Sequence, residues 1–297
     1  MVKKKSYLDT VYLDEELSSS FRITHRHEVI AVLVLFLLVF LIFTKHVGGS
    51  WNDQSRFATM EALVENPDNM PSFAIDYTTW GWWTGDKIFD GKHMYSTKPP
   101  VLSVFGAGIY SVLHDWLQMD YSNPKDEKII YFLITFLLIG GTTSIMMALF
   151  YDLMRRFGVI KKHAFFLTAA LGFGSLILPF TLVFNNHTFA GATIFISFYF
   201  LFKAIEHRGS RGWNLFISGL FAGLALTVDI IGAAPFAAAF TLYSLNMGLN
   251  RKWHKHVRFY GVALCGSFLI GFFVFILVHI YFNYQITGEL KPVYMKQ

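Results

Sequence analysis

Long apolar runs separated by short polar segments dominate the pattern of this sequence. A helix needs about 20 predominantly apolar residues to cross a bilayer, and the clearest such runs are residues 29–44, 129–149, 164–183 and 257–282. Two more apolar stretches cover residues 188–202 and 215–245, and the second is long enough for a hairpin that turns near Asp229 and Gly232. The pattern predicts an all-α integral membrane protein with about seven transmembrane helices.

Composition supports this class and narrows the functions. Hydrophobic residues make up 54% of the chain and charged residues 15%, so the apolar content exceeds what a soluble core requires. The basic residues behind the net charge of +5 lie in short segments between apolar runs, which indicates membrane topology and argues against a nucleic-acid partner. Cys265 is the single cysteine, so one chain can build neither a disulfide framework nor a thiolate metal site.

The apolar segment 100–117 decides the predicted topology. It begins at a Pro pair and carries His114 and Asp115. If it crossed the bilayer, most of the later basic clusters would lie outside, against the positive-inside rule. We therefore expect it to lie flat as an interfacial amphipathic helix. The prediction is a cell-membrane protein with a cytoplasmic tail at 1–27 and a membrane module at 28–297, within which residues 45–128 form a long extracytoplasmic loop.

Asp53 lies close behind the first apolar run, just before a short helix expected at 58–65. A carboxylate in this position is most often a helix cap. The functional alternatives are a general base or a metal ligand, because Asp53 should lie near the headgroups, where a lipid-linked phosphate presents its reactive end.

The segment 84–100 reads as a turn or small hairpin around Asp90 and Gly91. Lys98 precedes the Pro pair, where it can hold a phosphate or simply snorkel to a lipid headgroup. Trp80, Trp82 and Trp83 suit either an aromatic belt at the interface or stacking on a sugar.

Polar residues also occur at two later outward connections. Asn186 and His187 follow the third apolar run, where they can face a cavity or cap a helix. Asp229 is the only charge between Trp213 and Asn250, so we expect it in the interhelical turn or facing the loop, as a candidate of second rank.

Two motifs together resemble one family. The stretch Asp53-Gln54-Ser55-Arg56-Phe57-Ala58 resembles the Asp-Glu-x-Arg-Tyr-Ala pattern that follows the first helix of GT-C polyprenyl-phosphate-dependent glycosyltransferases. The stretch Tyr95-Ser96-x-Lys98-Pro99-Pro100 resembles the second loop motif of the branch with protein O-mannosyltransferases and aminoarabinose transferases, the family-39-like enzymes. The seven-helix order with two juxtamembrane helices in the first outer loop is also similar to their shared module.

The resemblance implies roles for the motif residues. Asp53 would be the catalytic base, and Arg56 and Lys98 would hold the donor phosphate. Candidates for substrate binding are Tyr95, Asp86, Lys87, Asn186 and His187. The donor would be a polyprenyl-phosphate-linked sugar and the acceptor a lipid, a glycan or a protein.

The sequence departs from the family pattern at two places that bear on a metal. Gln54 replaces the usual second acidic residue, and Asn186 with His187 stands where many members carry an acid. A divalent metal such as Mg²⁺ or Mn²⁺, with Asp53 and His187 as candidate ligands, therefore stays open. The alternatives are a non-catalytic carrier, flippase or assembly scaffold for lipid-linked glycans, and a truncated enzyme that ends at Gln297 with only its donor-binding half.

Overall fold

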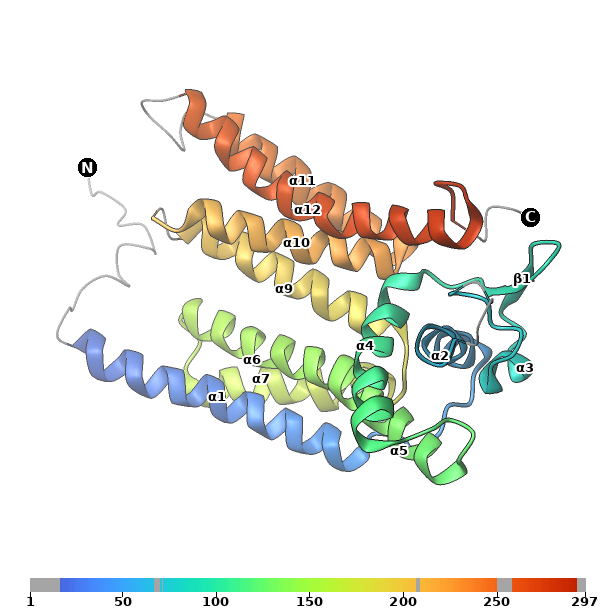
Figure 1. The fold of residues 1–297 in the computed structure, drawn as a ribbon. Helices are drawn as coiled ribbons and strands as arrows, with labels where there is room; N and C mark the ends of the chain where they lie inside the picture. Colours follow the sequence, from blue (N-terminus) through green and yellow to red (C-terminus); the bar gives the residue numbers. More distant parts are fainter. Residues whose placement is uncertain (1–16, 67–69, 71, 207–208, 250–257, 293–297) are drawn as a thin grey trace, which may run out of the picture.

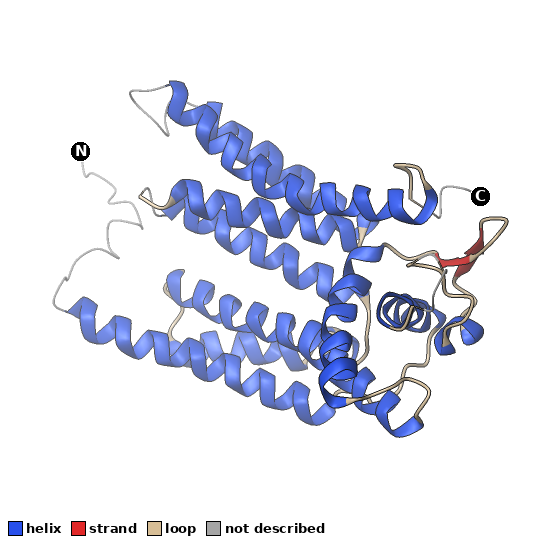
Figure 2. Cartoon of the chain, in the orientation of Figure 1, coloured by secondary structure: helices blue, strands red, loops and turns tan. Residues whose placement is uncertain are grey.

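The computed structural model describes residues 17–66, 70, 72–206, 209–249 and 258–292. Most of the predicted cytoplasmic tail, the basic loop at 250–257 and the chain end at Gln297 lie outside the described residues. The described chain forms a bundle of long helices with a smaller segment across one end (Figure 1). Figure 2 shows that, among the described residues, strands occur in one small hairpin in that end segment.

The bundle is built from helical segments that run side by side (Figure 1). Helix α5 continues through a π-helical turn, η1, into α6, so the three form one long helical stretch. The segments are α1 (Leu17–Phe43), α5 (Pro124–Thr135), η1 (Phe136–Gly140), α6 (Gly141–Arg156), α7 (Lys161–Phe173), α8 (Ile177–Thr181), α9 (Asn186–Glu206), α10 (Arg211–Val228), α11 (Ile230–Leu249) and α12 (Arg258–Thr287).

Within the described residues, five helical stretches are long and apolar enough to span a membrane. Because a lipid-exposed helix satisfies its own backbone hydrogen bonds, this is the arrangement expected of a membrane protein. The all-α membrane class is thus supported, while the predicted count of seven spans is not shown. The five stretches are His25–Phe43, Pro124–Arg156, Asn186–Glu206, Ile230–Leu249 and Gly261–Thr287.

The region predicted as one span at 164–183 is divided in the structure into two helices, α7 and α8, and is not one continuous helix. Gly172 and Gly174 are poor helix formers. The Ser175 hydroxyl also accepts a hydrogen bond from the Ile177 N–H at 3.1 Å, which offers the backbone an alternative to the helical ladder. The predicted break of the 215–245 stretch is confirmed, since α10 ends at Val228 and α11 begins at Ile230, with Asp229 between them.

The end segment contains α2 (Trp51–Val64), α3 (Thr79–Trp83), β1 (Lys87–Phe89), β2 (Met94–Ser96) and α4 (Pro100–Leu117). The hairpin predicted around Asp90 and Gly91 is confirmed: β1 and β2 pair antiparallel in the register Lys87 to Ser96, and Gly91 has a φ of 102°. The predicted helix at 100–117 is α4, which runs across the bundle helices rather than along them (Figure 1). Helix α2 begins earlier than the predicted 58–65 helix.

A cluster of aromatic rings fixes α2 on the end of the bundle. The ring of Phe57 on α2 is fully buried and lies 4.9 Å from the ring of Tyr131 on α5 and 5.1 Å from that of Phe184. Trp80 is also buried, with its ring 5.7 Å from Phe57, so its predicted place in an exposed belt or on a sugar was wrong. Trp82 and Trp83 are exposed.

Helices α10 and α12 approach closely along a line of glycines. A Cβ on Gly219 would lie 2.0 Å from the Phe268 carbonyl oxygen, and one on Gly223 would lie 2.2 Å from that of Phe272. Small residues at such spacing let two helix backbones come together in a membrane protein. The contact fixes the end of α10, and therefore Asp229, relative to α12.

Candidate functional site

Asp53 is held in a capping box at the start of α2. Ser50 is the N-cap residue, and its hydroxyl accepts the Asp53 N–H at 3.3 Å. The Asp53 Oδ1 atom accepts hydrogen bonds from the Ser50 N–H at 2.9 Å, the Ser50 hydroxyl at 2.7 Å and the Gln54 N–H at 3.0 Å. The helix-cap interpretation of Asp53 is therefore confirmed, whereas its role as a base stays a prediction.

The second Asp53 oxygen connects α2 to the bundle. Oδ2 accepts the Gly49 N–H and the Tyr131 hydroxyl, each at 3.2 Å. The Tyr131 oxygen in turn accepts the N–H of Phe184 at 3.2 Å, in the connection between α8 and α9. Asp53 is only 3% exposed. The carboxylate is thus rigidly oriented, and a proton can reach it only where one of these donors gives way.

Arg56 lies one helical turn after Asp53 and is almost fully buried. Its Nη1 donates to the Pro99 carbonyl at 3.3 Å, directly before α4. Its Nε is buried and has no hydrogen-bond partner among the described residues. A buried guanidinium with an unused donor is costly unless charges or a ligand compensate for it.

Three carboxylates provide that compensating charge around Arg56. Burial lowers the pKa of Arg56 to about 10, and the negative charges of Asp229, Asp86 and Asp53 oppose this shift. The three acids come from the α10–α11 turn, the segment before β1 and the start of α2. The structure therefore brings residues from three distant connections around one cation, which stays protonated at neutral pH.

Lys98 and Asp86 form an ion pair at the base of the hairpin. Lys98 Nζ lies 2.8 Å from Asp86 Oδ2, and both side chains are partly exposed. The Asp86 carbonyl accepts the Ser55 hydroxyl of α2 at 2.7 Å, and Ser55 Oγ lies 2.6 Å from Ser96 Oγ. Lys98 is thus linked to the Asp53 and Arg56 helix through Asp86.

His187 and Asp229 pair across two interhelical connections, the one before α9 and the one between α10 and α11. His187 Nδ1, at the start of α9, lies 2.6 Å from Asp229 Oδ2. The His187 side chain is 69% exposed, whereas that of Asp229 is 13% exposed. Asn186 is buried, and its Oδ1 has no hydrogen-bond partner among the described residues. These residues place a second polar group beside the Arg56 carboxylates.

Tyr95 and Lys87 point elsewhere. Successive strand residues face opposite sides, so Tyr95 faces away from the Ser96 contact with Ser55. Tyr95 is buried with Phe73, Ala74 and Ile286, and burial raises its pKa. Lys87 Nζ donates to the Gly81 carbonyl at 2.7 Å, at α3. The structure does not bring these two predicted substrate residues to the Arg56 group.

A second acidic site lies farther along α2. Glu61 is buried and accepts the N–H groups of Thr79 and Trp80 at 2.6 and 3.2 Å, which caps α3. Burial raises the pKa of Glu61 to about 7. Glu65, one turn later, accepts the Tyr110 hydroxyl of α4, and burial raises its pKa as well.

The described residues contain no group of three or more His, Cys, Asp or Glu side chains placed to hold a metal ion. Asp53 already accepts hydrogen bonds on both oxygens, and His187 pairs with Asp229. A bound divalent metal therefore remains a prediction. Of the two candidate ligands, His187 lies beside a carboxylate, that of Asp229.

Sequence reasoning missed the role of Tyr131. It lies just after the predicted end of the loop, where a tyrosine is ordinarily an interfacial anchor. Asp229 lies in the turn between α10 and α11, as predicted. The signal for its surroundings was its isolation, since one acid within a long apolar stretch calls for a polar partner. In the structure that partner is His187, and the charge of Asp229 also acts on Arg56.

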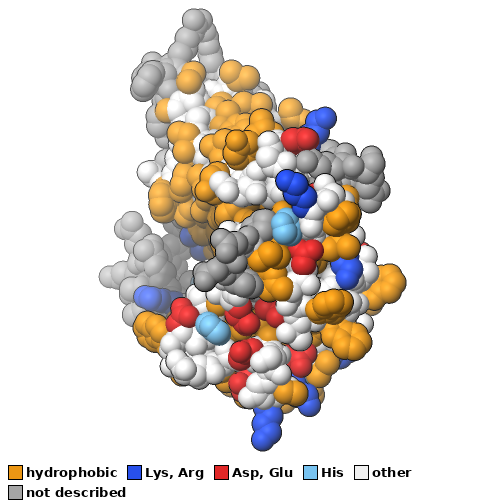
Figure 3. Space-filling view, turned by 45° about the vertical axis from the view of Figure 1, so that its right-hand side comes forward, with side chains coloured by type: hydrophobic (Ala, Val, Ile, Leu, Met, Phe, Trp, Pro, Cys, Tyr) orange, Lys and Arg blue, Asp and Glu red, His pale blue; other side chains and the backbone are white. Residues whose placement is uncertain are grey.

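Figure 3 looks toward this end of the molecule and shows acidic side chains interspersed with exposed hydrophobic ones. Comparisons with protein-family models, curated proteins and solved structures find no match to this chain.

Proposed function

We propose that this chain is a membrane glycosyltransferase that moves a sugar from a polyprenyl-phosphate donor to an acceptor outside the cytoplasm. The observation that carries the proposal is the buried Arg56, which keeps an unpartnered Nε amid the carboxylates of Asp53, Asp86 and Asp229. Arg56 supplies a fixed positive charge, and its free donor is of the kind that binds a phosphate oxygen.

The residues take complementary parts in the proposed reaction. Asp53 accepts the proton of the acceptor hydroxyl as the acceptor oxygen bonds to the anomeric carbon. The bond between that carbon and the phosphate oxygen breaks, and polyprenyl phosphate leaves with the electron pair. Arg56 and Lys98 stabilise the negative charge that develops on this phosphate.

The reaction requires two local rearrangements. Lys98 must exchange Asp86 for a phosphate oxygen, which partial exposure of both side chains permits. Asp53 must release one hydrogen-bond donor on Oδ2, where both hydrogen bonds, at 3.2 Å, are longer than the three on Oδ1.

The proposal includes an orientation. The site lies at the bundle end that carries α2 to α4, and we place this end outside the cytoplasm by the positive-inside rule. Helices α7 with α8, and α10, complete the seven crossings. α4 lies flat at the interface, beside the donor phosphate.

The test is transfer of label from polyprenyl-phosphate-linked sugars by the purified chain in lipid nanodiscs. We expect Asp53→Asn to lower the rate by about a hundredfold or more and Lys98→Gln by about a hundredfold. Lys92→Gln is the matched control, because Lys92 is exposed at the tip of the same hairpin. Unchanged transfer in both site variants would remove the catalytic assignment.

Asp53→Asn also disturbs the helix cap, so folding must be measured separately. Lys98→Arg keeps the charge and touches no buried hydrogen bond of Asp53, and we expect it to recover most of the rate lost in Lys98→Gln. A rate that follows thermal stability instead of charge at position 98 would indicate a structural role.

A non-catalytic carrier of lipid-linked glycans is the second candidate. One observation favours it: both oxygens of Asp53 are engaged in hydrogen bonds that serve the fold. Movement of a labelled lipid-linked sugar across a liposome membrane, with no transfer to any acceptor, would select this function.

A further inference from the structure

The bundle end opposite to α2–α4 contains a groove between α1 and α7. Both helices pack on α6. They meet at the ring stack of Phe36 and Phe173, whose centroids lie 4.8 Å apart, and Gly172 lets Phe36 approach the α7 backbone. Toward their N-terminal ends the helices leave a hollow of about 480 Å³.

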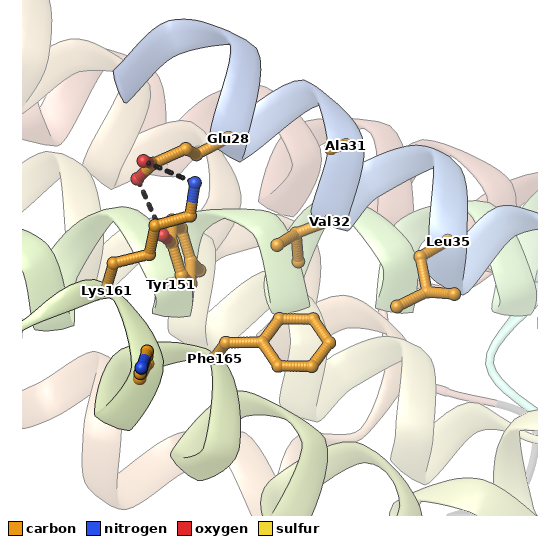
Figure 4. A pocket seen from close by; sticks show the side chains of 8 residues that line it. Glu28, Ala31, Val32, Leu35, Tyr151, Lys161 and Phe165 are labelled. Atoms are coloured by element: carbon orange, nitrogen blue, oxygen red, sulfur yellow. Dashed lines mark hydrogen bonds and ion pairs between the residues drawn. The ribbon is translucent and has the colours of Figure 1, made fainter. Parts of the chain in front are cut away.

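Apolar side chains line the body of this hollow. Val32 and Leu35 of α1 face Phe165 of α7, as Figure 4 shows, and Ala31 lies on the exposed side of α1. Because α1 is a candidate membrane span with exposed apolar side chains on its outer surface, the groove opens toward the lipid phase. Its shape and chemistry suit a hydrocarbon chain.

Charged groups cluster at the polar end of the same hollow. Lys161 Nζ lies 3.0 Å from Glu28 Oε1, and the Tyr151 hydroxyl donates to Glu28 Oε2 at 2.7 Å (Figure 4). Arg155 Nε lies 3.5 Å from the same carboxylate. These neighbours therefore offset the negative charge of Glu28, and the exposed Lys162 adds a further positive charge at the rim of the hollow.

We propose that this groove binds one anionic glycerophospholipid of the bilayer, with an acyl chain between α1 and α7 and its phosphate at Lys161 and Lys162. The charge complementarity is specific to an anionic lipid, because the lining carries the lysines and one acid that is already paired. The bound lipid would fill the opening between α1 and α7 and so hold α7 against the bundle.

The experiment uses the full chain in nanodiscs that contain equal amounts of phosphatidylglycerol and phosphatidylcholine with identical acyl chains. Native mass spectrometry then measures which lipid stays on the protein. We expect one phosphatidylglycerol to be retained in preference to phosphatidylcholine.

Two variants locate the bound lipid. Ala31→Trp fills the hollow from an exposed position, and we expect it to abolish the retained lipid. Leu38→Trp is its control, since Leu38 is 51% exposed on α1 and does not line the hollow. Lys162→Gln should lower the preference for phosphatidylglycerol about fivefold, while Lys162→Arg should keep it.

The proposal is overturned by equal retention of the two lipids, by retention that survives Ala31→Trp, or by displacement of phosphatidylglycerol by polyprenyl phosphate added to the disc. The same lipid loss in Lys125→Gln, a lysine at the other end of the bundle, would equally show that general charge and not the groove selects the lipid. Thermal unfolding of each variant checks that the bundle remains folded.

Discussion

The Tyr131 hydroxyl donates to Asp53 Oδ2 at 3.2 Å, and in this way the second half of α5 orients a carboxylate at the start of α2. The same hydroxyl oxygen accepts the Phe184 N–H. One phenol therefore joins the start of α2 to the connection between α8 and α9, and it sets the position of the proposed base.

Tyr131→Phe tests these two hydrogen bonds of the Tyr131 hydroxyl. The variant removes a donor to Asp53 and leaves the Phe184 N–H unsatisfied, so we expect a loss of about 1–3 kcal/mol in the free energy of unfolding. Tyr121→Phe is the matched control, because the buried Tyr121 hydroxyl has no partner among the described residues and its loss should cost little. Thermal unfolding in nanodiscs measures both, and equal losses would contradict the assigned role of Tyr131.

Gly48→Ala tests the same contact between Tyr131 and Asp53 by adding a methyl group next to it. A Cβ at this position would lie 2.8 Å from the Tyr131 ring and 3.1 Å from Asp53 Oδ2. We expect sugar transfer to fall, with a smaller loss of stability than in Tyr131→Phe, since the Tyr131 hydroxyl is kept and residue 48 lies outside α1 and α2. Gly49→Ala is the control, because a Cβ there meets nothing within 4 Å. Transfer that is equal in the two variants would argue against a precise geometry at Asp53.

Glu61 should make stability depend on pH. Its pKa in the folded protein is raised to about 7 from an ordinary 4.5, so the folded state binds a proton more tightly than the unfolded state. The contribution of Glu61 to stability is present below pH 4.5 and is lost as pH rises through about 7. The difference in melting temperature between about pH 5 and about pH 8 should shrink in Glu61→Gln. An unchanged difference would assign the pH dependence to other groups.

The glycine contact between α10 and α12 predicts opposite signs for two similar substitutions. Gly223→Ala places a Cβ 2.2 Å from the Phe272 carbonyl, so the helices must separate, at a cost of about 1–3 kcal/mol. Gly266→Ala on α12 meets nothing within 4 Å and should stabilise by roughly 0.5–1 kcal/mol through helix propensity. Melting temperatures that shift in the same direction would contradict the close packing.

Local features of the fold were readable from the sequence. Apolar runs predict membrane helices because a bilayer leaves the backbone no external hydrogen-bond partner. Asp90 and Gly91 marked the hairpin, since the turn needs a residue with positive φ. Asp53 suggested a helix cap for a similarly local reason. In each case the signal and the structure it specifies lie within a few residues.

The site itself depends on contacts that sequence spacing does not encode. Trp80 looks like a belt residue and is in the core, because Phe57 packs against it. The charges of Asp86 and Asp229 act on Arg56 only because the folded chain brings three separate connections together. The direction of Tyr95 was available from strand alternation once Ser96 was known to face α2.

The π-helical turn η1 sets the angle about the helix axis between side chains at the two ends of the long helix formed by α5, η1 and α6. Gly141 N–H bonds to the Phe136 carbonyl, five residues back, so this turn holds about one residue more than an α-helical turn. At about 100° per residue, Tyr131 and Tyr151 would point roughly 200° apart on an unbroken α-helix, and the wide turn reduces this to roughly 100°. One tyrosine can then serve Asp53 while the other serves Glu28. Removing a single residue from this turn would rotate one end of the helix by roughly 100° relative to the other, so that Tyr131 and Tyr151 could not both keep their partners.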